Sequence, residues 1–455
     1  MDAWRRVSTW LELQVESVDN AALFAAIHSL PVESAGSVVR LRKLFSAERI
    51  AAATELLAAR KKAAGKLDFS WPLFVDREGV EMASSTLCAR WKAARFEGAR
   101  VSGERVLDLV VERSRGILPA DGQIPSLAFD SALRSESACG GSSAGVGDQQ
   151  VLDLFSGIGA DLHALVEVCG EESVLGVELD PLRAWMACSN ARGRVREADA
   201  RSEEVQLMIP SALVHCDPPR RDAAGRAWKR GEETSDAFDL ATLLAWMRAA
   251  KGGALKLGPG VARELVTAAD AECEYIEVDG VMEQCVVWTG ALASNAGTTR
   301  ATQLGGAAIT RFGVPRGVPQ ADALGAYLFE PCASIERAGL LADLAQELDA
   351  AEVAPGLGLL TGNVAHTSRW AECFDIAGTV AQTPNAAVSQ RFSSVAQERF
   401  RSVRVRGKAL DTLGGADKVT RELDCQSNGT LVLFAWRRGA KAACVVARVR
   451  VEVKR

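Results

Sequence analysis

Apolar and polar residues recur along the chain with two different periods. Over "AERIAAATELLAARKKAAGKL" and over "ASSTLCARWKAARF" the apolar side chains have helical spacing, and the serines that begin the second stretch predict a helix cap. From Gln150 to about Gly290, short apolar strands alternate with helical stretches. That alternation is typical of a mostly parallel α/β sheet. The pattern predicts a helical segment followed by an α/β domain.

The remaining segments complete the predicted organisation. "SESACGGSSAGVGDQQ" is rich in Gly and Ser, which is typical of a flexible linker. A β-rich connector, "TTRATQLGGAAITRF", leads to a helical "SIERAGLLADLAQEL" and to closing strands "TLVLFAW" and "KAACVVARVRVEV". We therefore predict a helical N-terminal domain at 1–130, a linker at 131–149, an α/β domain with its connector at 150–320 and a small α+β domain at 321–455.

Composition narrows the class of protein. With 455 residues, 48% hydrophobic and 24% charged, the chain can form two or three globular domains. The start, "MDAWRRVSTWLELQ", lacks the apolar region of a secretory signal, and no apolar run approaches membrane-spanning length. The eleven cysteines are scattered without a C-x-x-C pair. We expect a reduced, cytoplasmic protein with no membrane partner and no metal.

Charge is distributed unevenly along the chain. The net charge is −5, but residues 399–455 contain fourteen Lys or Arg against five acids, a local charge of +9 that leaves −14 elsewhere. A basic end on an acidic body suggests an anionic partner. A solvated charged surface is the alternative interpretation.

The most informative stretch is "VLDLFSGIGAD", which combines a buried strand, a glycine turn and a helix start. Asp153 lies near the carboxyl end of the strand, and Gly157 and Gly159 form the turn, where a ligand must approach the backbone closely. The third glycine of the dinucleotide fingerprint would fall at position 162, which is leucine. This departure weakens an NAD interpretation.

Three further strands end in acids. "SVLGVELDP" ends in Glu178, placed to accept from ribose hydroxyls, and "VREADA" ends in Asp199, placed to accept from an adenine amino group. "SALVHCDPPRR" closes the fourth strand with Asp217, Pro218, Pro219 and Arg220. The carboxyl ends of parallel strands meet at the edge where open α/β sheets bind ligands. One such acid could simply cap a helix, but four in this order indicate a ligand site.

The end of the sheet indicates which cofactor that site holds. "ECEYIEVDGVMEQCVVWTG" predicts two strands joined at Asp279-Gly280, a hairpin signal. A terminal antiparallel hairpin on a parallel sheet is the device of S-adenosylmethionine-dependent methyltransferases. We therefore expect S-adenosylmethionine as cofactor, bound by Asp153, Phe155, Ser156, Gly157, Gly159, Glu178, Asp199 and Ala200.

The sequence resembles the bacterial class I methyltransferases that carry a C-terminal THUMP-like domain. The resemblance is carried by "ARKKAAGKL", "GVEMASSTLCARWKAARF", "DLFSGIGAD", "CDPPRR", "ALKLGPG", "GVMEQCVVWTG", "LGAYLFEPCASIERAGLLADLA" and "GLLTG". It implies a Rossmann-like class I methyltransferase sheet with a terminal antiparallel hairpin, a helical N-terminal domain and a THUMP-like α+β domain. Because THUMP domains bind structured RNA, it also implies an RNA substrate. The Gly/Ser insertion before Gln150 departs from the compact junction of the family.

The DPPR turn suggests the chemistry. Two prolines fix the chain so that the Asp217 side chain and the Pro218 carbonyl face the methyl donor, where they can accept from an exocyclic amine. The residue after the prolines is usually aromatic, whereas here it is Arg220, whose guanidinium can stack on a base or hold a phosphate. Methylation of uridine carbon 5 uses a similar turn but needs a nucleophilic cysteine, for which Cys216 and Cys285 are poor candidates.

Other residues have weaker signals. The sequence gives His215 a possible supporting role beside the site, and Lys256 either a phosphate contact or a solvated strand end. Two basic-aromatic groups could contact RNA or belong to the core and a solvated face: Arg60, Lys61, Lys62, Lys66 and Trp71, and Arg90, Trp91, Lys92, Arg95 and Phe96. We predict an RNA amine methyltransferase. The alternatives are a non-catalytic RNA-binding protein that keeps the scaffold, and a methyltransferase of a protein or small metabolite.

Overall fold

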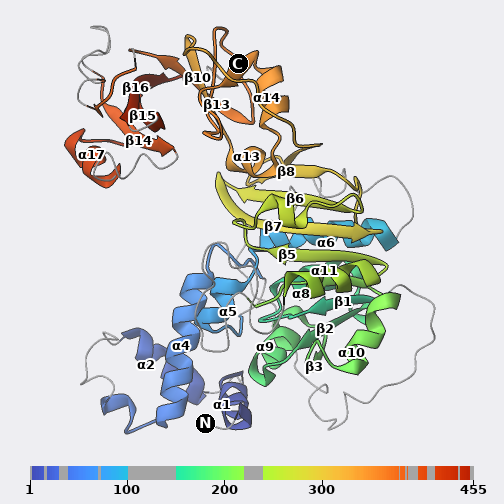
Figure 1. The fold of residues 1–455 in the computed structure, drawn as a ribbon. Coiled ribbons are helices and arrows are strands. Elements are labelled where there is room, and N and C mark those ends of the chain that lie inside the picture. Colours follow the sequence, from blue (N-terminus) through green and yellow to red (C-terminus); the bar gives the residue numbers. More distant parts are fainter. Residues whose placement is uncertain are drawn as a thin grey trace. The chain divides into compact units, whose positions relative to one another are not determined.

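The fold is taken from a computed structural model (Figure 1). It describes residues 3–14, 18–29, 39–69, 73–100, 150–219, 239–378, 380–384, 387, 398–406, 416–438 and 441–450. The predicted linker at 131–149 and the predicted site residue Arg220 lie outside these ranges. Among the described residues, no helix has both the length and the apolar character needed to span a bilayer.

Two compact units divide the chain. Unit 1 comprises Met1–Glu272, Gln284–Ala296 and Leu304–Ala308, and unit 2 comprises Cys273–Glu283, Gly297–Gln303 and Ile309–Arg455. The domain boundaries expected from the sequence stay predictions.

The described part of residues 1–100 is helical, as the apolar spacing predicts. Its helices are α1 (Ala3–Gln14), α2 (Val18–Ser29), α4 (Ala47–Ala63), α5 (Arg77–Met82) and α6 (Thr86–Arg100). Helix α4 begins after Ser46, whose hydroxyl accepts from the Arg49 amide at 3.2 Å. Basic residues in its last turn complement the helix dipole. Ser85 caps α6 by accepting from the Cys88 amide at 3.4 Å.

These helices share an apolar core with the α/β part of unit 1. Side chains from α1, α2 and α4 form one buried cluster with residues of the glycine loop and of helix α9 (Pro181–Ala191). Its members include Trp10, Leu23, Leu56, Val75, Ile158, Leu182 and Met186, each less than 9% exposed. The first hundred residues therefore contribute to the core on which the glycine loop rests.

The sheet of unit 1 has the predicted parallel arrangement. Its strands lie in the order β3-β2-β1-β4-β5-β7, where β1 to β5 are parallel neighbours and β7 runs antiparallel to β5. Helices α8 (Ala160–Cys169), α9, α10 (Glu203–Met208) and α11 (Leu240–Ala249) alternate with these strands. The strands are β1 (Val151–Leu154), β2 (Val174–Glu178), β3 (Arg194–Glu197), β4 (Leu213–Cys216), β5 (Gly252–Leu257) and β7 (Val281–Gly290).

The predicted hairpin is present. Strand β6 (Ala271–Val278) neighbours β7, and only Asp279 and Gly280 connect them. Asp279 has φ of 49° and Gly280 has φ of 79°, the left-handed pair that a tight two-residue hairpin requires. The chain reversal that distinguishes this sheet from an all-parallel dinucleotide fold is therefore confirmed.

Unit 2 combines a second sheet with short helices. After β8 (Thr299–Leu304) and β9 (Ile309–Gly313), strands lie in the order β11-β12-β10-β13-β16-β15-β14. In β15, Leu431, Leu433 and Ala435 enter one apolar cluster while Val432 and Phe434 enter another, so both faces of this strand are buried. The other elements are β10 (Tyr327–Pro331), α13 (Ala333–Ala338), α14 (Leu341–Glu347), β11 (Ala350–Glu352), β12 (Leu360–Gly362), β13 (Ala371–Ile376), β14 (Phe400–Arg406), α17 (Ala416–Glu422), β15 (Leu431–Arg438) and β16 (Lys441–Val449).

Candidate active site

The glycine loop follows β1 and turns sharply into α8. Phe155, Gly157 and Gly159 have φ of 63°, 56° and 85°, so every second residue of the loop is left-handed. A Cβ at position 159 would lie 2.8 Å from the Cα of Ala187 in α9, so only glycine fits there. Ser156 fixes the turn by donating from its hydroxyl to the Asp153 carbonyl at 2.8 Å. The loop can therefore bring its backbone close to a ligand.

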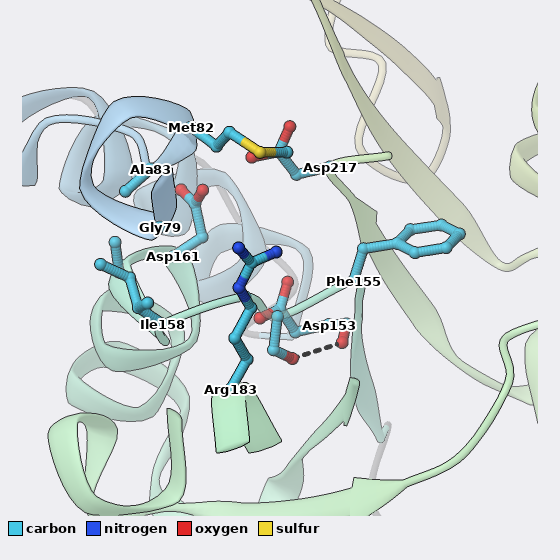
Figure 2. Close-up of a pocket in the computed structure, with 12 residues that line it drawn as sticks. Gly79, Met82, Ala83, Asp153, Phe155, Ile158, Asp161, Arg183 and Asp217 are labelled. Atoms are coloured by element: carbon cyan, nitrogen blue, oxygen red, sulfur yellow. Dashed lines mark hydrogen bonds between the residues drawn. The ribbon is translucent and has the colours of Figure 1, made fainter. Parts of the chain in front are cut away.

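A cavity at this loop brings some of the predicted residues together. Figure 2 shows the carboxylates of Asp153, Asp161 and Asp217 and the guanidinium of Arg183 turned toward the same space. The complete lining is Gly79, Met82, Ala83, Asp153, Phe155, Ser156, Gly157, Ile158, Ala160, Asp161, Arg183 and Asp217. Four of the eight predicted cofactor residues and the acid of the DPPR turn therefore line one cavity, although the Phe155 ring is turned away from the other labelled side chains (Figure 2).

One carboxylate oxygen of Asp153 has no hydrogen-bond partner among the residues that the structure describes. The side chain is 1% exposed, and its Oδ1 lies 2.7 Å from Nδ1 of His215. Its Oδ2 is buried and accepts no hydrogen bond from the described residues. Burial raises the pKa of this carboxyl, and the neighbouring His215 opposes the shift. A buried acceptor that is left unpaired is costly, so Oδ2 is suited to a ligand N–H or ammonium group.

A buried polar network lies behind Asp153. Lys92 of α6, 1% exposed, places its Nζ 3.1 Å from His215 Nε2, 2.7 Å from Asp161 Oδ1 and 3.1 Å from Ser84 Oγ. The Ser84 hydroxyl donates to Asp161 Oδ2 at 2.8 Å. Burial by itself raises the pKa of Asp161, but Lys92, His215 and Lys256 together outweigh it, and the pKa falls below its usual range. The network joins the helical segment to the sheet and fixes the orientation of Asp153.

Glu178 supports the glycine loop from β2. Its Oε2 accepts from the Gly157 amide at 2.8 Å and its Oε1 from the Asp180 amide at 3.0 Å. Burial raises the pKa of Glu178, while these two amides oppose the shift. Glu178 does not line the cavity. Because each of its carboxylate oxygens already accepts one amide, the predicted ribose contact would use the remaining lone pairs of these oxygens.

The predicted adenine-binding residues lie outside the cavity lining. Asp199 accepts from Arg201, whose Nη2 lies 2.7 Å from Oδ2, and this bond lowers the pKa of Asp199. The Ala200 carbonyl accepts from the Gln206 amide group at 2.6 Å. Their adenine contacts remain predictions.

The DPPR turn begins at the end of β4. The Asp217 amide donates to the Leu154 carbonyl at 3.2 Å, which holds the turn beside β1. The Asp217 carboxylate accepts a hydrogen bond from Nζ of Lys256 at 2.5 Å. Of the two prolines that follow, Pro218 is buried and Pro219 is half-buried. Lys256 is 3% exposed, so the expectation of a solvated strand end is wrong: β5 places it beside the turn instead.

The thiol next to this turn is unsuited to nucleophilic attack. Cys216 is fully buried, and burial together with the charges of Asp217 and Asp153 raises its pKa well above the ordinary value. A nucleophilic cysteine needs the opposite surroundings, because its thiolate is the reactive form. Cys285 is fully buried as well. The environment of both thiols argues against covalent chemistry at uridine carbon 5.

Helix α5 forms the part of the cavity wall that the sequence did not reveal. Gly79 packs so closely on the glycine loop that a Cβ there would lie 2.3 Å from Cγ2 of Ile158. Asp76 caps the helix by accepting from the Gly79 amide at 2.7 Å. Arg183 of α9 binds Asp76 at 3.4 Å and Glu78 at 2.7 Å. These contacts hold α5 against the loop, and only the long-range fold could have placed it there.

Most of the predicted RNA-contact residues of the helical segment have partners within unit 1. In the second group, Lys92 and Phe96 are buried, Arg90 pairs with Glu167 at 3.1 Å and Arg95 pairs with Glu272 at 2.8 Å. Arg95 also stacks on Trp288, with 4.2 Å to the ring centroid. In the first group, Arg60 donates to the Leu73 carbonyl and Lys66 donates to the Val80 carbonyl. Lys62 pairs with Glu81. Trp71 lies outside the described residues. Lys92 and Phe96 therefore belong to the core, whereas Arg90 and Lys62 are exposed, and RNA contact by these groups stays a prediction.

The basic end of the chain is likewise paired within unit 2. Arg404 and Arg406 of β14 both bind Glu330 of β10, and each also binds a second carboxylate, Glu372 or Glu336. Further pairs join Arg448 to Glu398 at 2.7 Å and Arg450 to Asp375 at 3.2 Å. These four of the fourteen basic residues in 399–455 are therefore paired with acids between 330 and 398.

Comparison with solved structures fixes the fold. A candidate methyltransferase from Porphyromonas gingivalis W83 matches with a TM-score of 0.60 and 14% identity over 95% of this chain and 99% of that one. The fold is that of a Rossmann-like methyltransferase. At this identity the likeness concerns the fold alone.

Other matches are weaker. The METTL16 methyltransferase domain matches with a TM-score of 0.29 and 10% identity, over 52% of this chain and 96% of that one. The N-terminal domain of human METTL16 in complex with SAH gives a TM-score of 0.22 and 14% identity, over 31% and 61%. No protein-family model and no curated protein matches the sequence.

Proposed function

We propose that this chain is an S-adenosylmethionine-dependent methyltransferase that acts on an exocyclic base amine of RNA. The observation that carries the cofactor assignment is the buried Oδ2 of Asp153, which accepts no hydrogen bond from the described part of the chain and lies in a cavity that Asp217 also lines. A carboxylate oxygen of this kind suits the ammonium group of the cofactor's methionine end. The methyltransferase fold and the left-handed glycine loop support the same proposal.

The residues around the cavity fit such a cofactor. Gly157 and Gly159 would admit the methionine end beside the backbone, with Phe155 and Ser156 completing the loop. Glu178, Asp199 and Ala200 would serve the ribose and the adenine. When bound, S-adenosylmethionine supplies a methyl group on a positively charged sulfur.

The DPPR turn would orient the acceptor. Asp217 faces the cavity from the end of β4, and Pro218 follows it in a chain segment whose φ the proline ring fixes. The Asp217 carboxylate and the Pro218 carbonyl would accept the two N–H bonds of an amine and hold its lone pair toward the methyl group. Positioning of this kind can supply a large part of the rate. Pro219 and Arg220 would contact the rest of the acceptor.

A second candidate is a methyltransferase of a protein or small metabolite. The specific observation in its favour is the pairing of the C-terminal arginines with carboxylates, which weakens the charge argument for RNA. A non-catalytic RNA-binding role would instead require that the chain bind the cofactor without transferring its methyl group.

Two measurements test the proposal. Calorimetry should show binding of S-adenosylhomocysteine that Glu178→Ala weakens by about 1–3 kcal/mol, the usual cost of stranding hydrogen-bond partners. Tight NAD binding without S-adenosylhomocysteine binding would contradict the cofactor. Mass spectrometry of nucleosides should show one methylated base missing from total RNA of a strain that lacks the gene. Unchanged nucleosides, with cofactor binding intact, would favour the second candidate.

A further inference from the structure

Lys256 connects three elements at the cavity. It lies at the end of β5, where the register pairs Leu255 with Cys216 of β4 and so places Lys256 beside Asp217. Its Nζ lies 2.5 Å from Asp217 Oδ2 and 3.3 Å from the Met82 carbonyl at the end of α5. Asp217 and Met82 both line the cavity. One ammonium group therefore joins the DPPR turn, the sheet and the helical segment.

The pair is placed to control the orientation of Asp217. Lys256 is 3% exposed, so water competes little for its ammonium, and a charge-assisted bond in such surroundings is strong. Among the described residues, Lys256 alone bonds the Asp217 carboxylate, and it does so through Oδ2. Oδ1 is thereby left for a donor that enters from the cavity. Without Lys256, the carboxylate could rotate about its side-chain bonds.

We infer that Lys256 is a positioning residue for methyl transfer, which it serves by fixing the Asp217 carboxylate so that one oxygen can receive the acceptor amine. This inference rests on the proposed function. The same contact allows an opposite effect, in which the Lys256 ammonium occupies the place of the acceptor amine and slows the reaction. The two effects differ in sign, so a rate measurement separates them.

The experiment uses the full chain, tritiated S-adenosylmethionine and total RNA from a strain that lacks the gene. Lys256→Ala should lower kcat by about 100-fold, the scale of a misplaced reactive group, with less than a twofold change in the dissociation constant of S-adenosylhomocysteine. Propylamine replaces the deleted part of the side chain, so adding it should restore at least a tenth of the lost rate. Lys251→Ala, an exposed lysine just before β5, should match the parent chain.

The other outcomes are equally clear. A Lys256→Ala rate within twofold of the parent, or above it, overturns the positioning role. If Lys256→Ala loses both rate and cofactor binding and propylamine restores neither, Lys256 serves the fold alone. Lys256→Met, which keeps most of the aliphatic side chain, would then lose rate and cofactor binding as well. If the parent chain binds S-adenosylhomocysteine but transfers nothing to this RNA, the RNA proposal fails, and the inference fails with it. Parental transfer with an unaffected variant rejects only the inference.

Discussion

Asp217 is the residue whose substitution should separate binding from transfer. It borders the cavity from the end of β4, whereas the residues proposed for the ribose and adenine lie at β2 and β3. Asp217→Ala should therefore leave S-adenosylhomocysteine affinity within about twofold while it removes most methyl transfer, because its proposed partner is present only with the acceptor. Calorimetry and single-turnover transfer to RNA would measure the two effects.

Cys216→Ser is the matched control for that variant. The thiol is buried and its pKa is raised well above the ordinary value, so the hydroxyl should be tolerated with little change in rate. A folded Cys216→Ser variant without activity, beside an active Asp217→Ala, would reverse the assignment and point to covalent chemistry.

Lys92 should matter most for stability. Lys92→Met would leave Asp161 buried without its ammonium partner, a change that typically costs about 3–5 kcal/mol. The folded-state pKa of Asp161 is lowered, so this stabilisation is present above the ordinary aspartate pKa of about 3.9 and is lost as the pH falls through the folded value. Urea unfolding at pH 7 and pH 3 should show a difference between parent and variant that shrinks at low pH.

The exposed pair on the same helix provides the comparison for Lys92. Arg90 and Glu167 are 47% and 38% exposed, so Arg90→Met should cost at most about 1 kcal/mol. Equal losses for the two variants would show that burial of the Lys92 pair is unimportant.

Local sequence predicts some of these residues and hides others. Asp153 and Asp217 stand at the ends of apolar strands, so their meeting at one sheet edge follows from the parallel topology. Lys92 occupies an ordinary helical charge pattern, and its partner His215 is 123 residues away. Periodicity identifies an apolar helix face, but it does not show that a lysine on that helix is 1% exposed. Burial of a charge depends on partners that no local window contains.

Among the elements, the strands and the hairpin were predictable and the role of α5 was not. Strands β1, β4 and β5 are short runs of buried residues, and Asp279-Gly280 supplies the turn residues that a hairpin needs. Helix α5 spans only Arg77–Met82, too short for a periodic pattern to identify it as a wall of the site. The position of α5 depends on the close packing of Gly79 against Ile158. It also depends on hydrogen bonds from Arg183 to Asp76 and Glu78, which lie more than a hundred residues away in the sequence.

Gly79 allows a test of this element. Alanine normally stabilises a helix interior relative to glycine by about 1 kcal/mol, but here the added Cβ would lie 2.3 Å from Ile158 and 2.4 Å from the Asp76 cap. Gly79→Ala should therefore destabilise the chain by about 1–3 kcal/mol and weaken S-adenosylhomocysteine binding, because α5 must move off the glycine loop. Thermal unfolding and calorimetry measure both effects. At Gly306 a Cβ would meet no atom within 4 Å, so Gly306→Ala should change neither; an unaffected Gly79→Ala would mean that α5 does not press on the loop.

At the scale of the whole molecule, the uneven charge of the sequence does not show which basic residues are paired with acids. Residues 399–455 carry +9, yet β14, β15 and β16 are built into the sheet of unit 2, and Arg404, Arg406 and Arg448 pair with its acids. Deleting this end would remove sheet strands along with any RNA contact. The salt dependence of RNA binding is therefore better tested with single substitutions.

Glu330 joins two of these arginines. It is 12% exposed and binds both Arg404 and Arg406, so Glu330→Gln should lower the free energy of unfolding by about 1–3 kcal/mol. The pair between Arg450 and Asp375 is 48% and 39% exposed, and Asp375→Asn should cost less than about 1 kcal/mol. Chemical unfolding of the two variants would rank them; a larger loss in Asp375→Asn would contradict the pairing argument.

The first helices and the glycine loop share one apolar core. The methyltransferase sheet should therefore not fold as a separate fragment. A fragment that begins at Gln150 would expose Ile158, Leu182 and Met186 to water, since their partners lie in the first hundred residues. It would also lack the Lys92 ammonium that compensates Asp161. Such a fragment should aggregate on expression, whereas co-expression with residues 1–100 should recover soluble material. The sheet and the first hundred residues would thus behave as one folding unit, which neither part could leave without exposing apolar surface.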